Sequence, residues 1–186
     1  MKKTFWIVLY MLLLGTNSLF AQSRIGNQDK QALEILFGLI EKNVVSTAEA
    51  MPADKYSFAP TNGEFKGVRT FGEQVKHAAA TNYILAAAAL GQDPPADAGD
   101  ETGPDSMYTK ADIVNYLKGS FSQLHKALDL IDQENPVVKT SPISPLQNGT
   151  ATRLALIMES VVHAYDHYGQ MVEYLRMNGN VPPASR

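Results

Sequence analysis

The stretch HAYDHYGQMVEYLR, residues 163–176, places two of the chain's four histidines four positions apart. Positions i and i+4 of an α-helix lie about 40° apart around the axis and ~6 Å apart along it. His163 and His167 would therefore point in the same direction. Apolar residues recur around them at helical spacing, which predicts a helix from about residue 150 to residue 178. Gly179 would end this helix.

Three further segments also have the period of an α-helix: residues 29–50, 70–90 and 109–134. Thr70 and Glu73 form a capping box at the start of the second of these segments. Strand-like alternation is scarce. Four long helices with connections of medium length predict an all-α fold, a four-helix bundle with long crossover connections.

The three connections differ in composition. Residues 51–69 hold apolar side chains between turn formers, so this segment is expected to pack on the bundle. Residues 91–108 are rich in Gly, Pro and Asp, and their five acids lack the spacing of a calcium loop, which predicts an exposed loop. Residues 136–149 carry three prolines and are expected to form the crossover into the last helix.

The N-terminus has the three-part pattern of a secretory signal. Lys2 and Lys3 precede an apolar run, which a short polar segment ending at Ala21 follows. We expect a signal peptide at residues 1–21 and one domain at residues 22–186, exported to the periplasm or the exterior. The apolar run is too short to span a bilayer comfortably, so no stable membrane span is expected after its removal. An uncleaved anchor and a core helix are the alternatives.

Composition restricts the classes of function. The chain is 45% apolar and 19% charged, as ordinary globular proteins are. Its 16 basic and 19 acidic residues give a net charge of −3, and removal of the two N-terminal lysines makes it −5 (14 − 19). An acidic domain is poorly suited to binding nucleic acid. Because there is no cysteine, any nucleophile must be water, a hydroxyl or an external thiol.

A third histidine completes a candidate metal site. His77 lies on an otherwise apolar stripe of the segment 70–90, where a neutral imidazole needs a partner. His77, His163 and His167 could together hold one divalent ion and leave positions open for water, as catalytic metal sites do. The alternative is three hydrogen-bonded core histidines without a metal. His125, the fourth histidine, is interpreted as a surface residue.

A zinc protease is the obvious competitor, and the sequence disfavours it. No glutamate follows His163, so the metalloprotease signature is absent. The inverted signature would require a glutamate where Asp166 stands.

These residues also carry a resemblance to a known family. The pattern His163-x-x-x-His167-x-Gly-Gln, followed by Tyr-Leu-Arg, resembles the last helix of the DinB-like superfamily. Upstream motifs are similar to the same family's first loop and second helix: Met51-Pro52, Tyr56-x-Phe58-x-Pro60, Phe71-Gly72-Glu73, and His77 followed by Asn82-Tyr83. The resemblance covers about residues 30–183.

The resemblance implies a four-helix bundle whose divalent metal ion, commonly zinc or nickel, is held by His77, His163 and His167. Homodimers are frequent in this family. Its characterised members include transferases and isomerases that use low-molecular-weight thiols, and many members have no known activity. Those thiols are cytoplasmic, whereas this chain is expected to be exported.

We therefore expect a metal-dependent transferase or hydrolase that acts on a small molecule. A non-enzymatic bundle that binds a metal or another ligand is the alternative. No general acid or base is assigned. Glu73 would cap its helix or contact a metal-bound water, Gln170 would orient a histidine or line the pocket, and Tyr174 would seal the core or line the pocket.

Overall fold

The structure is a computed structural model of the whole chain. It describes residues 26–131, 135–140, 142–144, 146 and 149–186. The predicted signal peptide, residues 1–21, lies outside the described residues.

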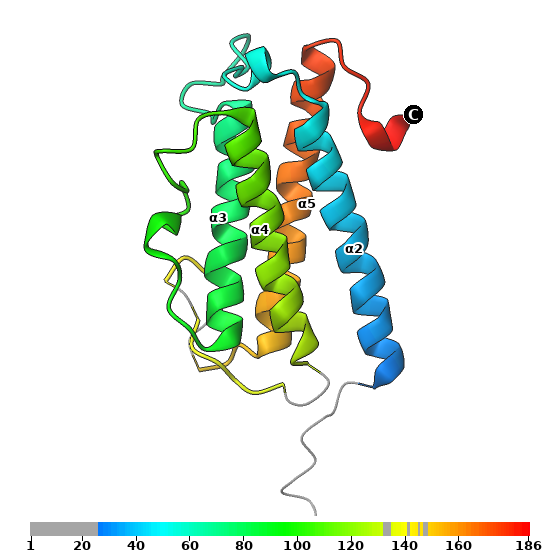
Figure 1. Cartoon of the computed structure of the whole chain (residues 1–186), viewed down its shortest axis with the longest axis vertical. Helices are drawn as coiled ribbons and strands as arrows, with labels where there is room; N and C mark the ends of the chain where they lie inside the picture. Colours follow the sequence, from blue (N-terminus) through cyan, green and yellow to red (C-terminus); the bar gives the residue numbers. More distant parts are fainter. Residues whose placement is uncertain (1–25, 132–134, 141, 145, 147–148) are drawn as a thin grey trace, which may run out of the picture.

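Four α-helices form a bundle whose axes lie side by side along the length of the molecule (Figure 1). They are α2 (Asn27–Ala50), α3 (Phe71–Leu90), α4 (Lys110–Asp129) and α5 (Arg153–Met177). The described residues contain no β-strand, only an isolated bridge between Val137 and Thr152. The predicted all-α four-helix fold is confirmed.

The direction of the helices determines which connection is long. In Figure 1, α2 and α5 run toward one end of the bundle, whereas α3 and α4 both run toward the other. The connection 91–109 must therefore return along the length of α3 before α4 can begin. The described parts of the segment 136–149, predicted to be the crossover, instead lie at the end of the bundle where α4 ends and α5 begins. That prediction was wrong because helical periodicity does not encode the relative direction of two helices.

Local hydrogen bonds explain where α3 begins and ends. The Thr70 hydroxyl accepts from the Glu73 backbone N–H at 3.3 Å, and the Glu73 carboxylate accepts from the Thr70 N–H at 2.8 Å. This capping box satisfies donors that the first turn leaves free. Gly91 ends the helix in the left-handed backbone conformation, with φ 71°. Residues other than glycine rarely adopt this conformation.

Helix α4 ends earlier than the sequence predicts, at Asp129 instead of about residue 134. After Asp129 two hydrogen bonds span three residues, as in a 3₁₀-helix, and not four. They run from Leu130 N–H to the Ala127 carbonyl and from Ile131 N–H to the Leu128 carbonyl. These bonds tighten the last turn, and Ile131 is buried there. Burial of Ile131 therefore accompanies the early end of the helix.

Helix α3 is the centre of the core, because its side chains are buried on most of its surface. Four consecutive alanines at 86–89 allow its neighbours to approach closely. The connection 51–69 packs on the bundle as predicted: Met51 and Tyr56 are buried, and the Tyr56 hydroxyl donates to the Ala48 carbonyl at 2.7 Å.

Among the described residues, no helix combines the length and the apolar composition that crossing a membrane requires.

Candidate metal centre

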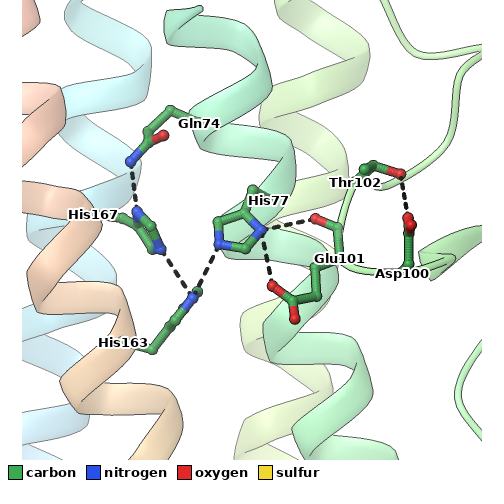
Figure 2. A network of polar contacts seen from close by, with 7 residues as sticks. All are labelled: Gln74, His77, Asp100, Glu101, Thr102, His163 and His167. Carbon is green, nitrogen blue, oxygen red and sulfur yellow. Dashed lines mark hydrogen bonds and ion pairs between the residues drawn. The ribbon is translucent and has the colours of Figure 1, made fainter. Parts of the chain in front are cut away.

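The three predicted histidines converge inside the bundle. His77 comes from α3, and His163 and His167 come from adjacent turns of α5 (Figure 2). The His163 Nε2 lies 3.2 Å from the His77 Nε2 and 2.9 Å from the His167 Nε2. Three nitrogens bound tetrahedrally to one zinc ion at about 2.0–2.1 Å would be about 3.3 Å apart. These two separations are therefore close to those between ligands of one ion, and the candidate ligand atoms of all three histidines lie within 4.8 Å of one another.

A hydrogen bond fixes which nitrogen of His77 is available. Its Nδ1–H donates to the backbone carbonyl of Glu101 at 2.9 Å, and the Glu101 carboxylate lies 3.5 Å from the same nitrogen. When the ring is neutral, its Nε2 carries no proton and directs a lone pair toward His163 and His167. This arrangement is typical of metal-ligating histidines, whose second ring nitrogen is bound by a carbonyl or carboxylate.

Glu101 itself adopts a strained backbone conformation. Its φ is 77°, and it is the only residue other than glycine with a positive φ in the part of the chain that the structure describes. Such conformations cost on the order of 1–3 kcal/mol and persist where the surroundings enforce them. In this conformation the Glu101 carbonyl accepts the hydrogen bond from His77.

His167 is held by a chain of amides. The Gln74 amide nitrogen lies 2.5 Å from the His167 Nδ1 and donates to the Gln170 side-chain oxygen at 2.7 Å. Gln170 in turn donates to the Asp166 carboxylate at 3.1 Å. A half-turn of the Gln74 amide exchanges its nitrogen and oxygen without a change of shape. In that orientation the Gln74 oxygen accepts a hydrogen bond from the His167 Nδ1–H, which leaves the His167 Nε2 free to bind a metal. The Gln170 amide must then turn as well, so that its nitrogen donates to Gln74 in place of Asp166.

Burial keeps all three rings neutral. It lowers the pKa of His163 to about 3, and the neighbouring His167 and His77 add to the effect. Burial likewise lowers the pKa of His167 to about 4, with contributions from His77 and Arg69, and it lowers the pKa of His77. Neutral imidazole is the form that binds metals. The donor set and its protonation therefore fit a divalent ion such as zinc or nickel.

The lowered pKa values predict how acid affects the metal-free protein. Between the ordinary histidine pKa of 6.5 and the lowered pKa values of about 3 for His163 and about 4 for His167, the unfolded chain binds protons on these two rings that the folded chain does not bind. The free energy of unfolding should therefore fall as the pH decreases through this window. Urea unfolding of EDTA-treated protein at several pH values measures this. The variant with all three histidines replaced by alanine should lose less stability, and equal losses would contradict the assignment.

Gln74 is expected to affect metal affinity without touching the ion. Gln74→Leu keeps the buried volume similar but removes the group that orients His167. The loss of such a partner typically weakens metal binding by about 10- to 100-fold. Competition with a zinc chelator would measure the change. The exposed Gln92→Leu is the matched control and should bind zinc as the unaltered chain does; equal affinity in both variants would refute the role of Gln74.

Other residues singled out in the sequence have structural roles. Both Glu73 carboxylate contacts go to Thr70, so the capping interpretation holds. The Tyr174 hydroxyl donates to the Arg69 carbonyl at 3.0 Å and its ring is buried, which fits the core interpretation. His125 is half-exposed and lies outside the cluster, where its Nε2 is 2.7 Å from the Glu41 carboxylate.

Sequence reasoning missed Gln74 and Glu101. Gln74 had a signal, because it is a polar residue one turn before His77 on a helix that is otherwise largely apolar. Glu101 had none. It is one of five acids in a connection expected to be solvated, and only the return of that connection along α3 brings it to His77.

A four-helix bundle with three converging histidines defines a class of helical protein that could hold a metal ion. The sequence profile of the DinB superfamily matches residues 37–171, which is most of the chain. The chain belongs to the DinB superfamily. No curated protein matches it.

Proposed function

We propose that the chain is an exported, metal-dependent transferase or hydrolase that acts on a small molecule. One observation carries this proposal: the Nε2 atoms of three histidines converge beside a cavity of about 440 Å³, which His163 also lines. Export is supported by the N-terminal sequence pattern alone. Mass spectrometry of the protein from its native host should find a mature N-terminus near residue 22.

In this proposal His77, His163 and His167 hold the ion, and zinc or nickel is favoured because both suit imidazole donors. When bound, such an ion supplies Lewis-acid chemistry and makes a nucleophile available near neutral pH. Three protein ligands leave a coordination position open, which is the layout of catalytic sites. The position of His163 in the cavity wall supports access from that side.

The side chains around the site would keep the ligands in place. The bond from His77 to Glu101 directs its Nε2 inward, and the Gln74 amide, once turned so that its oxygen accepts from Nδ1–H, would do the same for His167. Because these partners are fixed on α3 and on the returning connection, the ligands need little rearrangement to bind an ion.

Metal analysis of protein purified without added metal tests the site. We expect about one divalent ion per chain, and far less in the variant with all three histidines replaced by alanine. The cobalt-substituted protein should also change its visible spectrum when acetohydroxamate occupies the open position. Stoichiometric metal in the triple variant would refute the site. A visible spectrum that does not change when acetohydroxamate is added would favour a non-enzymatic metal-binding protein instead.

A further inference from the structure

The cavity beside His163 has walls of two kinds. Most of its lining is apolar, contributed by α5 and by the segment before it: Ile143, Leu146, Ala155, Met158 and Val162. Three carboxylates, of Glu101, Glu159 and Asp166, also line it. No lysine or arginine is among its described lining residues. The cavity therefore combines an apolar surface with negative charge.

Glu159 is the carboxylate that most clearly lacks a partner of opposite charge. It is half-buried, and its Oε2 accepts from the Ser144 hydroxyl at 2.7 Å. No ion pair is formed by Glu159 among the described residues. Burial raises the pKa of this carboxyl, because withdrawal from water disfavours its charge. A cation in the cavity would offset that cost.

Thr81 provides an independent observation in favour of a polar ligand in this cavity. It is one helical turn after His77 on α3, it lines the same cavity, and it is 5% exposed. Its hydroxyl is buried and has no hydrogen-bond partner in the described residues. Buried hydroxyl groups are nearly always paired, and a rotation of this side chain would let a polar group in the cavity supply the partner.

We propose that this cavity binds a small apolar molecule that carries a cationic amine. The apolar part lies against Met158 and Val162, the amine pairs with Glu159, and a polar group meets the Thr81 hydroxyl. This inference rests on the proposed function, because it names the substrate class of the same site. Glu159 and His163 are four positions apart on α5, so the amine lies ~6 Å along the helix from the metal ligand.

The same charges disfavour an anionic tail on the molecule. A carboxylate or phosphate near Glu159 and Asp166 would meet like charges in a partly desolvated space, where repulsion is stronger than in water. A metal ion would offset negative charge only at the histidine end of the cavity. The preference for a cation should therefore depend on Glu159.

Three alkyl hydroxamates of equal length, ending in a methyl, an ammonium or a carboxylate group, test this preference. All three present the same metal-binding head. By calorimetric titration of the zinc-loaded mature chain, we expect the ammonium compound to bind at least about fivefold more tightly than the methyl compound, and the carboxylate compound most weakly. Equal or tighter binding of the carboxylate compound would overturn the proposal.

Matched variants locate the effect. Glu159→Gln keeps the shape and an acceptor for Ser144, and it should reduce the ammonium preference to less than about twofold. Glu173→Gln removes the same charge from the same helix, ~21 Å further along, and should leave the preference intact.

Thr81→Val should raise the stability of the chain yet weaken the binding of all three hydroxamates. An unchanged preference in Glu159→Gln, or unchanged affinity in Thr81→Val, would overturn the assignment.

A second titration separates this inference from the metal assignment. An alkylamine, an alcohol and a carboxylate of equal length are titrated into the EDTA-treated chain, which holds no metal. The amine should bind most tightly, and Glu159→Gln should abolish its advantage. If the chain binds no metal but keeps this preference, only the proposed catalytic function fails. If it binds metal but shows no preference for the amine, only the inference fails.

Discussion

Replacing His163 by alanine should weaken zinc binding by roughly a thousandfold, or ~4 kcal/mol. His163 is the central member of the cluster, since its Nε2 is within 3.2 Å of the Nε2 atoms of both other histidines. Its loss leaves two ligands, which is too few for a typical protein zinc site. The effect should exceed that of losing a residue that only orients a ligand. Competition titration against a chelator of known affinity measures it.

His125→Ala is the control for this experiment. It removes the same type of side chain from α4, where the ring contacts the Glu41 carboxylate and packs against Phe37 with ring centroids 4.8 Å apart. This variant should bind zinc as the unaltered chain does, although its stability falls somewhat. A comparable loss of affinity in both variants would mean that the ion is bound elsewhere or that the fold is lost.

Phe71→Ala should lower the free energy of unfolding by about 3–5 kcal/mol. The Phe71 side chain is fully buried at the start of α3, and its ring packs edge-on against Tyr56 with centroids 5.2 Å apart. It also faces Tyr174 across the junction with α5. Truncation would leave a cavity that rigid helix ends cannot close. Urea unfolding of the metal-free chain at neutral pH measures the loss.

Phe65→Ala is the matched truncation on the surface. Phe65 is 38% exposed, so the change should cost less than about 1 kcal/mol. Equal losses of stability in the two variants would mean that the burial of Phe71 does not stabilise this junction as described. The Phe71 variant should still bind zinc while folded, because His77 is nearly two helical turns further along α3.

The features that the sequence predicted were those that local patterns determine. The capping box of Thr70 and Glu73, the spacing of His163 and His167, and the apolar stripe around His77 all follow from neighbours within one helical turn. The pattern also led to the interpretation that His77 shares a site with the α5 histidines, which the structure places together.

Features that depend on contacts between distant segments were not predicted. Glu101 reaches His77 only because α3 and α4 run in the same direction, and no period in the sequence encodes that direction. α4 ends at Asp129, just before Ile131 is buried in the core, and this burial involves segments far away in the sequence. Neither outcome could be derived from the residues beside it.

The positions of the ligands on the chain have a consequence for biogenesis. His77 and His163 are 86 residues apart, so an ion that joins them acts as a cross-link across almost half of the polypeptide. By analogy with a disulfide, closing such a loop would disfavour the unfolded chain by on the order of 4–5 kcal/mol. Because His163 and His167 lie on α5, the set of ligands is not complete until that helix has been synthesised. A chain translocated before folding would therefore acquire its ion at its destination, and its metal content would reflect the supply in that compartment.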